Sequence, residues 1–295
     1  AAGPHSQLAQ NIIAAWLCGA RYLELKTVQT LDELNVSKPC IDMQDEGYNC
    51  EWSQELKIHQ SFDQYLNAWI LIHLLNHKLH GLTQAGAGTI FNMSVGYNME
   101  GILKDNVQWF FQKMNNCRAE LDAKLEIVRK YYPDIDKTDI PDQLSDNITL
   151  STMHGCPPDE IEKIGLYLIQ EKKLHTVIKL NPTLLGPDML RWILNGRLGF
   201  KTVVPDEAFA HDLKYNDALS IIRNLKEAAE TAGVFFGLKL TNTLESENIR
   251  GIFPANEKMN YMSGRALHPV SVHLAAKLQA EFDGMLDISF SAGAD

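Results

Sequence analysis

Hydrophobic and polar positions alternate along this chain with two different periods. Short runs rich in β-branched and apolar residues, which are typical of strands, are separated by longer stretches with helical spacing. The predicted strands are 22–28, 89–95, 147–153, 176–181, 201–204, 235–241 and 286–291. The repeated order of strand and helix predicts a parallel sheet, and it favours a (β/α)8 TIM barrel over an open doubly wound sheet.

Three of the stretches between the strands carry an apolar stripe with helical spacing. The stripes are Phe62, Leu66, Trp69 and His73; Ala218, Ile221, Ile222 and Leu225; and Leu267, Val270, Leu274, Leu278 and Phe282. Two segments interrupt this rhythm. We expect the long connection 30–61 to cover an active site, and the polar, proline-bearing segment 131–146 to be a surface insertion. The sequence predicts that residues 1–295 form one domain.

Composition narrows the classes of function. The 295 residues are 45% hydrophobic, enough for one large core, and the formal net charge of −10 provides no broad positive field for nucleic acid or an anionic membrane. No run approaches the roughly 20 apolar residues of a membrane-spanning helix. The five cysteines are odd in number and lack CxxC spacing, so we expect a cytoplasmic protein. Both ends of the chain resemble strand-to-loop junctions, which predicts a fragment of a larger multidomain protein.

The predicted strands end in polar residues, and barrel enzymes carry their chemistry at the carboxyl ends of strands. Lys26 and Lys179 lie in otherwise apolar strands, where an unpaired ammonium is costly to bury. A flavin supplies a partner, because a lysine beside its N1–C2=O edge stabilises the negative charge that reduction places there. A lysine that reaches solvent from a strand end, or that pairs with Glu24, explains the pattern as well.

Amide and hydroxyl side chains form a second group of candidates. Asn49 and the run Thr241, Asn242 and Thr243 offer donors and acceptors that match the N–H and C=O groups of a flavin or a pyrimidine-like ring. Local turn capping accounts for them equally well. Backbone amides at Gly264 and in Ser291-Ala292-Gly293 would suit a phosphate at a helix N-terminus.

Cys156 precedes Pro157-Pro158-Asp159-Glu160, which predicts the first turn of a helix. The positive end of a helix dipole lowers the pKa of a thiol, and such a cysteine could exchange a proton with a substrate. A partly buried, inert cysteine fits the same spacing.

Other groups of residues are weaker candidates for a functional site. His73, His77 and His80 share one helix face, but no HExxH arrangement accompanies them, so we favour packed histidines over a metal site. Gly86-Ala87-Gly88 precedes a predicted strand, which is the wrong order for a dinucleotide-binding loop, and no GxSxG elbow or P-loop is present.

With these residues assembled, nearly the whole chain resembles the FMN barrel of dihydroorotate and dihydropyrimidine dehydrogenases. It is most similar to the N-terminal part of proteins described as selenate reductase iron–sulfur subunits, which belong to purine-related gene clusters. The motifs that carry the resemblance are Ala1-Ala2-Gly3-Pro4, Leu25-Lys26-Thr27, Phe91-Asn92-Met93-Ser94, Leu150-Ser151 with Cys156-Pro157, Lys179-Leu180, Thr241-Asn242-Thr243, Ser263-Gly264-Arg265 and Ser291-Ala292-Gly293. Thr149 stands where the family has asparagine, and Cys156 follows Ser151 by five residues instead of directly.

The resemblance assigns a role to each matching position. It implies that the cofactor is bound by Ala2, Gly3, Lys26, Lys179, Lys239, Thr241, Gly264 and Gly293, with Lys179 and Lys239 competing for one contact. The implied substrate-binding residues are Asn49, Asn92, Asn242 and Thr243, and the implied catalytic acid or base is Cys156.

The same resemblance implies an FMN-dependent oxidoreductase that transfers hydride to or from a double bond of a small nitrogen heterocycle, a pyrimidine or an oxidised purine. Its electrons would come from NAD(P)H through FAD and [4Fe-4S] clusters in other domains or subunits, and a homodimer is left open. Two alternatives stay open: another FMN barrel oxidoreductase, selenate reductase-like or glutamate-synthase-like, and a barrel without flavin that serves as a structural or docking module.

Overall fold

The computed structural model describes residues 6–26, 41–42, 48–49, 56–80, 88–96, 98–152, 155–251 and 253–291, organised around two sheets. A six-stranded parallel sheet has the order β1-β4-β5-β6-β7-β10, and a four-stranded antiparallel sheet has the order β2-β3-β9-β8. The strands are β1 (Tyr22–Glu24), β2 (Ile41–Asp42), β3 (Tyr48–Asn49), β4 (Ile90–Val95), β5 (Asn147–Ser151), β6 (His175–Leu180), β7 (Phe236–Leu240), β8 (Leu244–Glu247), β9 (Met259–Met262) and β10 (Ile288–Phe290).

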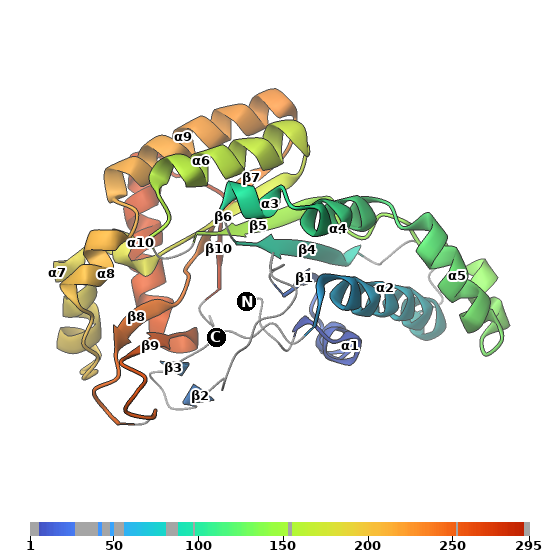
Figure 1. Ribbon diagram of the computed structural model, residues 1–295, viewed down its shortest axis with the longest axis horizontal. Helices are drawn as coiled ribbons and strands as arrows, with labels where there is room; N and C mark the ends of the chain where they lie inside the picture. Colours follow the sequence, from blue (N-terminus) through green and yellow to red (C-terminus); the bar gives the residue numbers. More distant parts are fainter. Residues whose placement is uncertain are drawn as a thin grey trace.

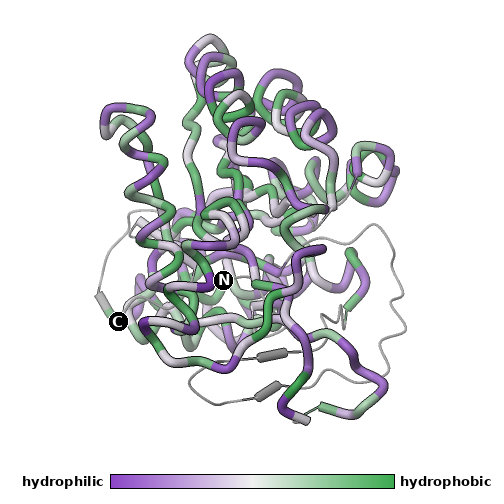
Figure 2. The backbone as a smooth tube through the Cα atoms, turned by 90° about the vertical axis from the view of Figure 1, so that its left-hand side faces the viewer, coloured by the Kyte–Doolittle hydropathy of each residue, from purple (hydrophilic) through white to green (hydrophobic). Residues whose placement is uncertain are grey.

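Helices surround the parallel sheet on its outer side (Figure 1). They are α1 (Ala9–Leu17), α2 (Ile58–His80), α3 (Met99–Ile102), α4 (Asp105–Asn115), α5 (Arg118–Arg129), α6 (Pro158–Leu166), α7 (Pro187–Arg191), α8 (Asp206–His211), α9 (Tyr215–Ala232) and α10 (His268–Glu281). The predicted stripes are confirmed, because α2, α9 and α10 with its flanking turn bury them except for Phe282, which is partly buried, and hydrophobic and hydrophilic positions alternate along the helices in Figure 2. Across the described ranges no helix combines the length and the apolar character that crossing a membrane demands.

The strand predictions hold for the parallel sheet, with one error. Residues 201–204 form no strand: they lead to Pro205, which precedes α8, and Val203 accepts a 2.9 Å backbone hydrogen bond from Glu247. An apolar, β-branched run is compatible with a connecting segment as well as with a strand, so composition alone does not distinguish the two.

The segment 131–146, which the sequence predicts to be a surface insertion, contributes several side chains to the core. Ile135, Ile140 and Leu144 are 2%, 5% and 2% exposed. The indole nitrogen of Trp69 on α2 donates a 3.0 Å hydrogen bond to the carbonyl oxygen of Pro141. The segment therefore packs against the barrel through these residues.

The two faces of the parallel sheet differ in chemistry. Side chains alternate between the faces along each strand. The outward set is apolar and buried under helices: Phe91, Met93, Ile148, Leu150, Ile178, Leu180, Leu238 and Leu240. We call the opposite face the lumen. Apart from Val177, its side chains toward the carboxyl ends of the strands are polar: Glu24, Asn92, Ser94, Thr149, Ser151, Lys179 and Lys239.

The lumen is the concave side of a curled sheet. Glu24 on β1 forms an ion pair with Lys239 on β7, although β4, β5 and β6 lie between these two strands. Side chains that are separated by three strands can meet only when the sheet curls around them. Such curling is typical of the sheet in a TIM barrel.

The four-stranded sheet, which we call the accessory sheet, joins two distant connections of the barrel. Its strands β2 and β3 belong to the connection that follows β1, whereas β8 and β9 follow β7. Asn49 pairs with Tyr261 in the antiparallel ladder between β3 and β9. Because both connections leave the carboxyl ends of barrel strands, the accessory sheet belongs to the end of the barrel where such enzymes place their loops.

Candidate active site

Two lysines stand side by side near the carboxyl ends of the central strands. The parallel ladders align Ser151 with Lys179, Lys179 with Lys239, and Lys239 with Ser289. Aligned residues of a parallel sheet project from the same face, so this row crosses β5, β6, β7 and β10 inside the lumen.

Lys239 is neutralised by Glu24. The two side chains form a salt bridge across the lumen, and the residues are only 6% and 8% exposed. The hydroxyl oxygen of Ser94 lies 3.5 Å from Oε1 of the same carboxylate. Burial by itself would raise the pKa of Glu24, but Lys239 and Lys179 outweigh it and lower that pKa below its usual range. Glu24 is therefore an anion at neutral pH.

Lys179 differs from its neighbour. Its ammonium makes no hydrogen bond or ion pair within the described part of the chain, and the side chain is partly exposed. Burial lowers the pKa of Lys179, with Lys239 adding to the effect and Glu24 opposing it. Glu24 thus forms a salt bridge with Lys239, and Lys179 keeps a side-chain nitrogen that a ligand can engage.

Asn242 ties together the ends of three strands. Its Nδ2 donates to the carbonyl oxygens of Thr152 and Lys179 at 2.8 and 3.2 Å and to Oδ1 of Asn181 at 2.7 Å. These neighbours are all acceptors, which fixes the orientation of the amide. Among the described residues Oδ1 of Asn242 has no hydrogen-bond partner. This oxygen is the acceptor that remains for a ligand.

Other predicted polar residues are engaged within the protein. Asn92, which is fully buried, donates to Oδ1 of Asn147 and accepts from the Thr149 hydroxyl, both at 2.7 Å. Thr241 is 4% exposed, and its carbonyl oxygen accepts a 2.5 Å hydrogen bond from Ser291. These residues build the frame around Lys179 and Asn242.

Cys156 lies before α6, as predicted, but its acidity is the opposite of what we predicted. Burial raises the pKa of the thiol to about 11, and Glu160 and Asp159 add to the increase. The loss of solvent and the acidic first turn of α6 both favour the protonated thiol. At neutral pH Cys156 is therefore a protonated thiol.

Asp212, which belongs to no motif visible in the sequence, fixes the loop that leads to Cys156. Its carboxylate accepts a 3.3 Å hydrogen bond from the Gly155 amide and a 2.6 Å bond from the Thr183 hydroxyl. The side chain is 4% exposed and comes from the connection between α8 and α9. It joins the loop after β5 to the turn after β6.

The structure describes only some of the remaining predicted site residues. Gly264 has a φ of +72° at the start of the turn before α10, a conformation that favours glycine. Ala2, Gly3 and Gly293 lie outside the described residues, as does the side chain of Asn49.

Known proteins resemble this chain over its whole length. Residues 1–295 match the family described as the N-terminal TIM-barrel domain of oxidoreductase YgfK. The chain belongs to this family. YgfK proteins of Escherichia coli K12 and O157:H7 are each 44% identical to it over 322 aligned residues, which cover 100% of this chain and 30% of theirs. The chain thus spans 30% of the length of these relatives.

A solved structure supports the fold independently. The crystal structure of ligand-free DHODH from Eimeria tenella aligns with a TM-score of 0.53 and 12% identity, over 100% of this chain and 72% of that one. At this identity the likeness concerns the fold alone. The predicted TIM barrel and its likeness to the dihydroorotate dehydrogenase barrel are confirmed at that level.

His73 on α2 serves packing. Burial lowers the pKa of His73 to about 4, although Asp139 opposes the change, and the ring packs edge-on against Trp69 with centroids 4.6 Å apart. Within the described ranges no group of three or more His, Cys, Asp or Glu side chains is placed to hold a metal ion.

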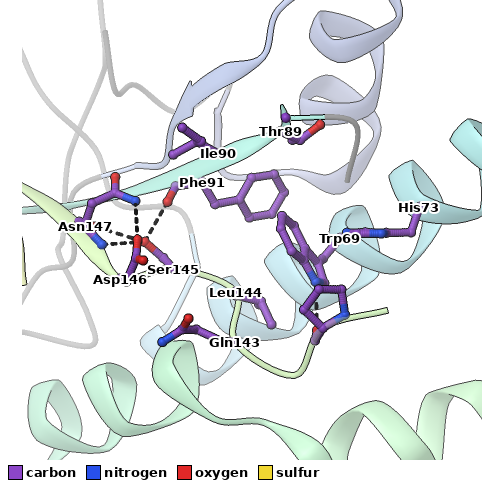
Figure 3. Close-up of a pocket in the computed structure, with 12 residues that line it drawn as sticks. Trp69, His73, Thr89, Ile90, Phe91, Gln143, Leu144, Ser145, Asp146 and Asn147 are labelled. Atoms are coloured by element: carbon purple, nitrogen blue, oxygen red, sulfur yellow. Dashed lines mark hydrogen bonds between the residues drawn. The ribbon is translucent and has the colours of Figure 1, made fainter. Parts of the chain in front are cut away.

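A separate pocket of about 350 Å³ opens at the amino ends of β4 and β5 (Figure 3). Its lining includes Trp69, Phe91 and Asn147, and the Ser145 hydroxyl donates a 2.6 Å hydrogen bond to the Phe91 carbonyl oxygen. In TIM barrels this end of the strands serves stability, whereas catalysis belongs to the opposite end. The candidate site is therefore the lumen around Lys179 and Asn242.

Proposed function

We propose that this chain binds FMN in the lumen and serves an oxidoreductase that transfers hydride to or from a double bond of a small nitrogen heterocycle, a pyrimidine or an oxidised purine. The observation that carries the proposal is the ammonium of Lys179, which has no partner among the described residues and stands in a polar lumen beside the neutralised Lys239. TIM barrels ordinarily fill this space with Val, Ile and Leu. A polar lumen with an available cation fits an electron-rich ring.

The chemistry of the candidate residues supports FMN as the cofactor. Lys179 and Lys26 would hold the electron-rich edge of the ring, and Gly264 would offer its backbone to the phosphate together with Gly293. Thr241, Ala2 and Gly3 would complete the cofactor site. When bound, the flavin supplies the exchange of a hydride. The Lys179 ammonium would stabilise negative charge on the ring edge.

Asn242 supports a nitrogen heterocycle as the substrate. Its nitrogen is used by Thr152, Lys179 and Asn181, so it offers Oδ1, which accepts hydrogen bonds. An acceptor selects a ligand that carries an N–H group, as pyrimidines and oxidised purines do. Asn49, Asn92 and Thr243 belong to the same proposal as further substrate-binding residues.

Cys156 would act as the acid. The pKa of about 11 keeps a proton on Sγ at neutral pH, so the thiol can donate it to a substrate carbon. The reverse role would need a thiolate, which this pKa disfavours. The proposal therefore favours reduction of the double bond. Because the chain spans 30% of the length of its relatives, we further propose that NAD(P)H, FAD and [4Fe-4S] clusters elsewhere in the protein deliver the electrons.

The test uses full-length protein purified without added flavin. Heat extraction and chromatography should yield FMN from the wild type. Lys179→Met should lose it, and Lys163→Met, which changes an exposed lysine of α6, should retain it. A full-length protein that holds no FMN and cannot be reconstituted would contradict the proposal and favour a docking module.

The substrate class is tested by anaerobic reduction of the flavin followed by uracil, xanthine or urate. Reoxidation by one of them, lost in Cys156→Ala, is expected. Full turnover in Cys156→Ala would instead favour another type of FMN barrel that does not use this cysteine.

A further inference from the structure

Lys179 and Lys239 are chemically identical neighbours with different surroundings. They are aligned across β6 and β7 and share the lumen face. Lys239 forms a salt bridge with Glu24, whereas Lys179 has no such partner among the described residues. One carboxylate on a distant strand is therefore in direct contact with Lys239 and not with Lys179.

We propose that Glu24 is a positioning residue that holds Lys239 in an ion pair across the lumen, balances its charge, and so reserves Lys179 as the lysine that acts on the cofactor. This inference rests on the proposed binding of FMN. It goes beyond the assignment of cofactor-binding lysines, because Glu24 itself need not touch the ligand.

The physical reason lies in burial and distance. Glu24 and Lys239 are 8% and 6% exposed, so solvent screens their charges weakly. Adjacent strands are roughly 4.8 Å apart, which brings the charge of Lys239 close to any group that Lys179 contacts. While the pair is intact, the two charges largely cancel at the ligand.

Removing either member of the Glu24–Lys239 pair leaves the charge of the other member without a compensating charge. Replacing Glu24 leaves an additional positive charge near the ring, which stabilises the negatively charged reduced form and raises its midpoint potential. Replacing Lys239 leaves a negative charge and lowers the midpoint potential. A role limited to tying β1 to β7 would destabilise both variants without shifting the potential in opposite directions.

The experiment measures the midpoint potential of the flavin in full-length protein by anaerobic spectroelectrochemistry. Glu24→Gln should shift it upward, Lys239→Met downward, and the double variant should return close to the wild-type value. Other redox centres are identical in all variants, so differences between the titrations report on this site. The control is the exposed Lys226–Glu230 pair of α9, where Glu230→Gln and Lys226→Met should leave the potential unchanged.

If Glu24→Gln or Lys239→Met prevents folding, conservative variants that keep the charge still test the proposal. Glu24→Asp, which shortens the reach to Lys239, should raise the potential by a smaller amount, and Lys239→Arg should preserve it. Shifts in the same direction, or none, in flavin-containing variants would overturn the role of Glu24 and leave FMN binding intact. A wild-type protein that holds no flavin would overturn the proposed function itself, and this inference with it.

Discussion

The outer face and the lumen face of the parallel sheet are built by the same strands, yet they satisfy different demands. On the outer face, residues such as Phe91 and Leu238 are 1% exposed and contact other apolar groups. On the lumen face, polar groups satisfy one another, as in the Glu24–Lys239 pair, but the Lys179 ammonium has no such partner in the described part of the chain. The outer face therefore supplies most of the stability, and the lumen gives up some stability for an available cation.

The largest expected effect is on the outer face. Phe91→Ala should lower the free energy of unfolding by about 3–5 kcal/mol, because it leaves a cavity beside the buried Trp69. The two rings now pack with centroids 4.9 Å apart. Chemical denaturation is the measurement, and Ile90→Ala, at a neighbouring position that is 43% exposed, is the control. Equal losses at both positions would refute the contrast between buried and exposed positions.

Asn242 offers a test at the edge of the lumen. Asn242→Ala should cost about 1–3 kcal/mol, because it leaves buried acceptors on Thr152 and Asn181 without their donor. It should also weaken substrate binding. Thermal unfolding and ligand titration check the two effects. Asn224→Ala, which removes an exposed hydrogen bond to Glu162, should change neither, and a loss as large as that of Asn242→Ala would remove the special role of Asn242.

Lys179→Met should change stability in the other direction. Without ligand, removal of this ammonium should stabilise the protein by about 0.5–2 kcal/mol while FMN binding is lost. The pKa of Lys179 is lowered in the folded state, so the unfolded chain holds the proton more tightly and the wild type gains stability as pH rises toward the ordinary lysine pKa of 10.5. The difference from the variant should shrink over that window. A destabilised variant would show that Lys179 is a structural lysine.

The smallest expected effect concerns Cys156. Its alkylation by iodoacetamide should accelerate with pH up to about pH 11, because the raised pKa of the thiol limits the thiolate that reacts. Asp159→Asn, which removes one of the acidic causes, should move the profile slightly toward lower pH. The Cys156→Ala variant gives the background rate from other cysteines. A midpoint below the ordinary thiol pKa of 9.0 would restore the helix-dipole prediction.

Alternation within single strands made the barrel predictable. The lysines of β6 and β7 interrupt apolar runs, and this local signal marks Lys179 and Lys239 as unusual in the sequence itself. Which of them is paired could not be predicted, because Glu24 and Lys239 are 215 residues apart and meet only through the curl of the sheet. The same holds for Asp212, whose partners Gly155 and Thr183 belong to other connections.

Short strands within long connections escaped prediction for a different reason. The accessory strands β2 and β3 have two residues each, too few to show a period, and each forms only by pairing with another strand. The run 201–204 shows the converse, since it has the composition of a strand but forms no ladder with another strand among the described residues.

The ladder between β3 and β9 has a consequence for biosynthesis. On the ribosome, Asn49 is made long before its partner Tyr261, and the barrel strands β4 to β7 are made between them. Such a non-local pairing forms late, because the strands between its two partners must first assemble and offset its loop-closure entropy. The nascent chain must therefore carry an unpaired strand edge until almost the whole barrel has been translated.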